Sequence, residues 1–210
     1  MTDLLFKEGD ETKNPVFLTS SDRVIFLRQE TPFRQIFEVP EYRFNDIHPS
    51  DRVIDIGANV GAFCIRASQF SPHIVAVEPV TASLLRENIL LNGVPVRVME
   101  GALGTGGPGY VSWDDCGVIS PKYPLSRIIE MAGGCDFLKC DCEGAEWCIQ
   151  PEDLAGIRRI EMELHIPPIG GPPNPDLLDY IGRQYTFEIE RKPVHAMLGV
   201  MGVLHAERKG

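Results

Sequence analysis

The stretch that decides the fold is DRVIDIGANVG, residues 51–61. The apolar run from Val53 to Ile56 predicts a short buried strand, and the apolar stretch after residue 61 is typical of a helix. Asp55 interrupts this strand, and a buried carboxylate is costly unless a partner or solvent reaches it. Gly57 and Gly61 bracket the turn that follows. We therefore expect the strand to end in a crevice where glycines let the backbone approach a ligand, an ordinary tight turn being the alternative.

Composition places the chain among ordinary globular proteins. Its 210 residues suffice for one α/β domain with a substantial core, and its hydrophobic content of 43% is typical of that class. The formal net charge of -10 disfavours sequence-independent binding to nucleic acid, whose phosphate backbone is also negative. No apolar run approaches the roughly 20 residues of a membrane span, and the acidic N-terminus does not resemble a signal peptide. We expect a cytoplasmic protein that does not bind a membrane.

Strand-like and helix-like segments alternate from residue 51 onward. The expected strands are 53–56, 73–77, 96–99, 135–142, 157–164, 186–190 and 196–204, and the expected helices are 61–69, 81–91, 123–132 and 177–183. This order predicts an α/β fold with a doubly wound, mostly parallel seven-stranded sheet. Residues 49–210 would form this domain. Residues 1–48, with strand-like runs at 16–18 and 24–27, would form a small N-terminal cap.

Two further segments are expected to be irregular. The glycine-rich stretch 104–109 predicts a loop, after which Val111 and Trp113 could belong to a short extra strand. The Pro- and Gly-rich stretch 167–175 predicts a second loop that could lie over the site.

Ligands of doubly wound sheets collect at the carboxyl ends of the strands. Polar or glycine residues occupy this position at five successive expected strands, and they are Asp55 and Gly57, Glu78, Gly101 and Ala102, Asp141 and Glu143, and Glu163 and His165. We expect these residues to converge on a single cleft.

The second strand end indicates the type of cofactor. Glu78 is placed to accept hydrogen bonds from ribose hydroxyls, which leaves a nicotinamide dinucleotide or S-adenosylmethionine. The turn Gly57–Gly61 lacks the G-x-G-x-x-G pattern that seats a pyrophosphate. Asp55 would repel a pyrophosphate but would suit a ligand that bears an ammonium and a sulfonium. The turn therefore favours S-adenosylmethionine.

Four motifs in order, DIGANVG (55–61), VEPV followed by LLRENILLNG (77–93), LKCDCEGAE (138–146) and EMELH (161–165), resemble the FkbM family of S-adenosylmethionine-dependent methyltransferases. The resemblance covers roughly residues 50–166 and implies a Rossmann-like class I methyltransferase fold. The cofactor-binding residues that it implies are Asp55, Gly57, Asn59 and Gly61 at the methionine end, Glu78 at the ribose, Ala102 near the adenine, and Asp141. It implies that Glu143 faces the transfer site and binds the acceptor.

Methyl transfer to a hydroxyl also requires removal of the hydroxyl proton, and a neutral histidine is the usual base near pH 7. His165 is the candidate base, with Glu163 or Asp141 orienting it, and a histidine that only packs is the alternative. Asp141 and Glu143 lie two apart on an extended segment and therefore point to one face, where they could bind a divalent cation. No third ligand is evident in the sequence, so no metal is expected.

Four cysteines gather at positions 135, 140, 142 and 148. Their spacing lacks the C-x₂-C pairs of common zinc sites. Cys140 and Cys142 occupy strand positions where the FkbM family usually has valine or isoleucine. We therefore expect small buried hydrophobic residues rather than zinc ligands.

The leading hypothesis is a methyltransferase that acts on a hydroxyl of a small molecule or sugar. The alternatives are an RNA or protein methyltransferase, a non-catalytic nucleoside-binding module of the same fold, and a dinucleotide oxidoreductase, which the missing glycine pattern disfavours. A homo-oligomer is possible. Acceptor choice would depend on residues 1–48, where Tyr42 and Arg43 are candidates, and on the loop 167–175.

Overall fold

The computed structural model describes residues 17–18, 25–26, 36–37, 40–113, 115–191 and 197–210. Seven strands in these ranges form one sheet, in the spatial order β11-β12-β10-β9-β3-β4-β5. They are β3 (Arg52–Ile56), β4 (His73–Val77), β5 (Val96–Met99), β9 (Phe137–Cys140), β10 (Arg159–His165), β11 (Tyr185–Arg191) and β12 (Val200–Arg208). β12 runs antiparallel to both of its neighbours, β10 and β11, and the other adjacent pairs in this sheet are parallel. The expected doubly wound, mostly parallel seven-stranded sheet is confirmed.

The order of the strands reverses in the middle of the sheet. The chain builds outward from β3 through β4 to β5 and then returns to β9 on the other side of β3. The strands β3 and β9 pair in parallel from Val53 with Phe137 to Ile56 with Cys140. Ligands of such sheets bind outside the carboxyl ends of the strands at this reversal.

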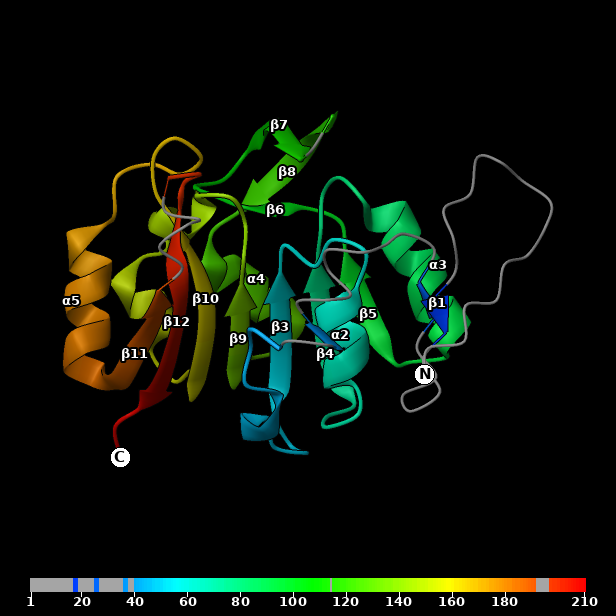
Figure 1. Cartoon of the computed structure of the whole chain (residues 1–210), viewed down its shortest axis with the longest axis horizontal. Coiled ribbons are helices and arrows are strands. Elements are labelled where there is room, and N and C mark those ends of the chain that lie inside the picture. The colour runs from blue at the N-terminus through cyan, green and yellow to red at the C-terminus, as the bar shows by residue number, and fades with distance from the viewer. Residues whose placement is uncertain (1–16, 19–24, 27–35, 38–39, 114, 192–196) are drawn as a thin grey trace.

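Helices cover both faces of the sheet (Figure 1). They are α2 (Ala62–Ala67), α3 (Ala82–Asn92), α4 (Leu125–Ala132) and α5 (Pro175–Gln184), with the short 3-10 turns η2 (Phe44–Asp46), η3 (Ala145–Cys148) and η4 (Pro151–Leu154). Val53 joins one hydrophobic cluster with Phe63 of α2 and Leu85 of α3. Ile54, on the opposite face, joins another with Ile128 of α4 and Ile181 of α5. Because both faces of the sheet are buried, the central strand β3 is apolar at most of its positions.

A second, three-stranded sheet differs from the expectation. It consists of β6 (Ala102–Leu103), β7 (Pro108–Trp113) and β8 (Cys116–Tyr123), and the β7–β8 hairpin projects beyond the ends of the main strands (Figure 1). The sequence predicted only a loop and a short strand here, because glycines obscure the alternating pattern. The helix expected from Tyr123 begins at Leu125 instead. Tyr123 precedes Pro124, and a residue before proline is disfavoured in a helix.

The N-terminal segment is described only in part. The strands β1 (Phe17–Leu18) and β2 (Ile25–Phe26) pair in an antiparallel manner inside the two expected runs. Tyr42 and Phe44 pack in the cluster that covers β3. Most of the expected cap lies outside the described residues, so the division into 1–48 and 49–210 stays a prediction. No helix in the described part of the chain is long and apolar enough to cross a membrane.

Candidate functional site

A cavity of about 290 Å³ lies where the strand order reverses. Its wall includes six of the predicted site residues, namely Gly57, Asn59, Glu78, Ala102, Asp141 and Glu143. They come from the ends of β3, β4 and β9 and from β6, so these strand ends share one cleft, whereas the end of β10 does not line it. Four other predicted residues, Asp55, Gly61, Glu163 and His165, lie outside this wall.

The turn after β3 can be formed only with glycine at its first position. Gly57 has φ 73°, and a Cβ there would lie 1.7 Å from the carbonyl oxygen of Asp141. The backbone N–H of Gly57 donates to the carbonyl of Val77 at 3.0 Å. Asn59 follows with φ 48°, a left-handed conformation in which asparagine is enriched. The glycine therefore serves the close packing of β3 on the segment after β9, as well as leaving room at the cavity.

Glu78 is fixed in the cavity wall by backbone donors. Its Oε1 accepts from the N–H groups of Val80 at 2.7 Å and Thr81 at 3.0 Å. Its Oε2 accepts from the N–H of Asn59 at 2.9 Å. An ionised carboxylate has about four acceptor positions. Glu78 is therefore held in one orientation and still has capacity to accept from a ligand hydroxyl.

Asp55 is used inside the protein rather than in the cavity wall. Its side chain is fully buried, and its Oδ1 lies 3.0 Å from Nζ of Lys139 on the adjacent strand β9. Nζ also donates to the carbonyl of Gly57 at 2.9 Å. Burial raises the pKa of Asp55, although the positive charge of Lys139 opposes this shift. Contrary to the expectation from the sequence, Asp55 is not available to attract a cationic ligand, because Lys139 already compensates its charge.

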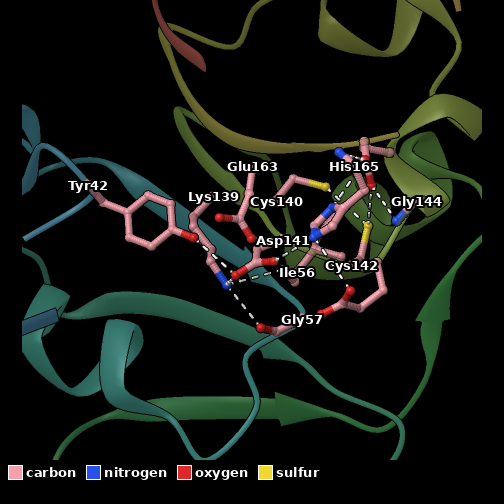
Figure 2. A network of polar contacts seen from close by, with 12 residues as sticks. Tyr42, Ile56, Gly57, Lys139, Cys140, Asp141, Cys142, Gly144, Glu163 and His165 are labelled. Atoms are coloured by element: carbon pink, nitrogen blue, oxygen red, sulfur yellow. Dashed lines mark hydrogen bonds and ion pairs between the residues drawn. The ribbon is translucent and has the colours of Figure 1, made fainter. Parts of the chain in front are cut away.

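Three carboxylates converge on Nε2 of His165 at the end of β10, and a fourth faces Nδ1. Its Nε2 lies 3.3 Å from Oε2 of Glu163 and 3.5 Å from Oε2 of Glu143. The distance from Nε2 to Oδ1 of Asp141 is 3.8 Å (Figure 2). On the other side of the ring, Nδ1 lies 3.2 Å from Oε1 of Glu146, which also accepts from the backbone N–H of His165 at 2.7 Å. The sequence-predicted catalytic residues therefore do lie together.

The environment of His165 does not fit a neutral base. Burial acts to lower the pKa of His165, but hydrogen bonds to Glu146 and Glu163 and the surrounding negative charge raise it to about 11. An imidazole that is protonated at neutral pH has no lone pair with which to accept a proton. Burial raises the pKa of Asp141 to about 6 against the lowering effect of Lys139. Burial also raises the pKa of Glu143.

The cysteines take no part in a ligand group within the described residues. Cys140 is fully buried in a hydrophobic cluster, with Cys142 packed against it, and their sulfur atoms are 3.5 Å apart. The group of three metal-type ligands that converges in this part of the chain consists of Asp141, Glu163 and His165.

Several contributors to the site were not assigned from the sequence. Tyr42, named only as a possible acceptor contact, donates from its hydroxyl to Oδ2 of Asp141 at 3.0 Å. Glu146 and Lys139 both belong to the LKCDCEGAE motif. A lysine within an expected buried strand needs a charged partner, so Lys139 could have been predicted to form a buried ion pair.

The hairpin also contributes to the cavity, where Tyr110 and Trp113 of β7 and Lys122 of β8 belong to its wall. The loop 167–175 does not contribute to that wall as far as the chain is described. Its Gly170 packs instead against the backbone of His165. The hairpin thus takes the place that the sequence had assigned to this loop.

No family model matches the chain, and no curated protein matches it by sequence. Solved structures do resemble its fold. TYW2 from M. jannaschii, crystallised in complex with AdoMet, is 14% identical with a TM-score of 0.56, over 98% of this chain and 90% of that one. An rRNA methylase from Streptococcus thermophilus is 7% identical with a TM-score of 0.54, over 80% and 92%. Trm5b from Pyrococcus abyssi is 12% identical with a TM-score of 0.52, over 99% of this chain and 62% of that one. The chain thus has the Rossmann-like fold of class I methyltransferases.

Proposed function

We propose that the protein is an S-adenosylmethionine-dependent methyltransferase of the FkbM family that methylates a hydroxyl of a small molecule or sugar. The observation that carries this proposal is the shared cavity at the strand-order reversal. Glu78, which is suited to a ribose, lines the same cavity as Asp141 and Glu143, which are suited to an acceptor. The fold and the order of the four sequence motifs support it.

The residues present fit this cofactor. Glu78 has acceptor capacity left for a ribose hydroxyl, since its three backbone partners occupy three of its about four positions. The turn from Gly57 to Gly61 would receive the methionine end, and Ala102 would border the adenine. When bound, the cofactor supplies an electrophilic methyl group on a sulfonium. Asp55 would act on the turn through Lys139, which donates to the carbonyl of Gly57.

The acceptor would lie against the acidic side of the cavity. Glu143 lines the wall and its side chain is 43% exposed, so it is placed to take the proton of an acceptor hydroxyl. Asp141 would hold the acceptor. Glu163 and His165 lie outside the cavity wall, and they would act as positioning residues through Asp141 and Glu143. Aligning the hydroxyl with the sulfonium in this enclosed space can supply several kcal/mol, about 7 in favourable cases.

A labelled-cofactor assay on a panel of acceptors tests this function. We expect label to enter a hydroxyl compound, and we expect Glu143→Gln to lower kcat by about 100-fold or more, since general bases contribute about that much. Glu87→Gln, which changes an exposed carboxylate on α3, serves as the matched control and should keep full activity.

Transfer of label only to RNA or to protein would reassign the acceptor. A gel-shift assay with RNA at low salt checks the nucleic-acid alternative independently, and the net charge of -10 predicts no shift. Absence of transfer to any acceptor, together with absence of cofactor binding, would contradict the proposal.

A further inference from the structure

The acidic residues around His165 have the layout of a metal centre. The oxygen atoms of Asp141 and Glu163 and the nitrogen Nε2 of His165 all lie within 4.8 Å of one another. Nε2 is 3.3 Å from Oε2 of Glu163 and 3.8 Å from Oδ1 of Asp141. Atoms that bind one ion at about 2.0–2.2 Å lie roughly 3.0–3.5 Å apart. The two distances from Nε2 therefore lie within a few tenths of an ångström of this range.

The histidine is oriented from outside this group. His165 is only 1% exposed, and its Nδ1 faces Oε1 of Glu146 at 3.2 Å. The other oxygen of Glu146 accepts from the backbone N–H of Gly144 at 2.9 Å, so Glu146 is itself fixed. Its contact with Nδ1 directs Nε2 toward the two carboxylates. Metal-binding histidines are typically held in this way by a carboxylate at the second ring nitrogen.

The aspartate is oriented from outside as well. The hydroxyl of Tyr42 donates to Oδ2 of Asp141 at 3.0 Å, which leaves Oδ1 on the side of His165 (Figure 2). Tyr42 is buried, and it packs edge-on against Phe63. Hydrogen-bonded support of a ligating carboxylate is the second common feature of metal sites.

Charge at this point also favours a cation. Asp141, Glu143 and Glu163 surround a single imidazole. The lysine nearest to Asp141, Lys139, lies 3.8 Å away and makes its closer contacts with Asp55 and with the carbonyl of Gly57. A bound divalent ion is often the largest local charge in a site and would balance these carboxylates.

We propose that Asp141, Glu163 and His165 bind one divalent cation on the acceptor side of the cavity. The ion would displace the proton from Nε2 of His165, because an imidazole nitrogen must be deprotonated to bind a metal. A mixed set of carboxylate oxygens and one imidazole nitrogen suits Mn²⁺ better than Ca²⁺ or Mg²⁺, which prefer oxygen ligands alone. Because Asp141 borders the cavity, the ion has open positions toward it. Its use in catalysis rests on the proposed function: an acceptor with two neighbouring oxygens, such as a vicinal diol, would bind there.

Titration of metal-free protein with MnCl₂ tests the site without any measurement of activity. Electron paramagnetic resonance of free Mn²⁺ should show one bound ion per chain with a dissociation constant in the micromolar range. We expect Glu163→Gln and His165→Gln each to weaken Mn²⁺ binding by more than about tenfold. Glu78→Gln changes a carboxylate in the same cavity that is outside the ligand group, and it should keep the wild-type affinity for Mn²⁺.

Thermal unfolding of each variant checks that it is folded, and S-adenosylmethionine binding is a second check for Glu163→Gln and His165→Gln. The proposal is overturned if wild-type protein binds no Mn²⁺ at millimolar concentration, or if folded Glu163→Gln binds it as tightly as wild type. Cofactor binding without Mn²⁺ binding would contradict the cation site and support the methyltransferase assignment. Mn²⁺ binding at these residues without cofactor binding would support the cation site and contradict the methyltransferase assignment.

Discussion

The two sides of the cavity are built differently. On the β3–β4 side, the wall is shaped by backbone: Gly57 and Asn59 adopt left-handed conformations, and three backbone N–H groups hold Glu78. On the β9–β10 side, side chains from distant segments hold one another, as Tyr42 holds Asp141 across 99 residues. A backbone-built wall is encoded by short local motifs, whereas a side-chain-built wall depends on how remote segments pack.

The largest expected effect is on the backbone-built side. Gly57→Ala should reduce the free energy of unfolding by at least about 4 kcal/mol, because its Cβ would overlap the carbonyl oxygen of Asp141 and φ is positive. Gly171→Ala is the control, since a Cβ there meets no atom within 4 Å, and its change should stay within about 0.5 kcal/mol. Chemical denaturation measures both. Equal stability of the two variants would mean that the turn is not built as described.

The next largest effect concerns the ion pair between the two sides. Lys139→Met should destabilise the protein by about 3 kcal/mol at pH 8, because it leaves Asp55 charged and buried without a partner. Burial and the charge of Glu78 raise the pKa of Asp55 in the folded state. Within the window between the unfolded and folded pKa values, the native chain then binds more protons than the unfolded chain, so stability falls as pH rises.

The loss caused by Lys139→Met should accordingly be smaller at pH 5 than at pH 8. Urea denaturation at the two pH values gives the comparison, with wild type measured in parallel. A loss that is equal at both pH values, or larger at pH 5, would show that an unpaired Asp55 is not the cause.

A smaller effect is expected on the side-chain-built side. Tyr42→Phe removes the hydrogen bond to Asp141 and should cost about 1 kcal/mol of stability. It should lower kcat and weaken Mn²⁺ binding by about tenfold, while the dissociation constant of S-adenosylmethionine stays unchanged. Parallel weakening of cofactor binding would show that the two sides are not separate in function.

The smallest expected effect on stability is in the hairpin. Trp113 is 37% exposed and lies in the cavity wall, so Trp113→Ala should change the free energy of unfolding by less than about 1 kcal/mol. The KM for the acceptor should rise. Steady-state kinetics and thermal unfolding on the same preparation distinguish the two quantities, and an unchanged KM would remove the hairpin from acceptor recognition.

The sequence predicted the backbone-built side well, because strand periodicity and glycines are local signals. The strand at residues 73–77, the position of Glu78 and the turn at Gly57 were all expected where they are found. The hairpin was expected only as a short strand. Its glycines interrupt the alternation of apolar and polar residues, so the sequence pattern did not indicate that β7 pairs with β8.

The role of Asp55 could not be read from the sequence, because it depends on the sheet register. Only the pairing of β3 with β9 places Lys139 opposite Asp55. The charge of His165 is a similar case. It depends on Glu146, which is 19 residues away and reaches Nδ1 through tertiary packing. The roles of Asp55 and His165 therefore depend on side-chain partners from other parts of the fold, which local sequence patterns do not indicate.

Calorimetric titration of the wild-type protein with S-adenosylmethionine decides whether the cavity at the strand-order reversal is a cofactor site. We expect one cofactor per chain with a dissociation constant in the micromolar range, weakened about 10- to 100-fold in Glu78→Ala through loss of a charged hydrogen bond. No heat at millimolar cofactor, or equal binding by wild type and folded Glu78→Ala, would contradict it.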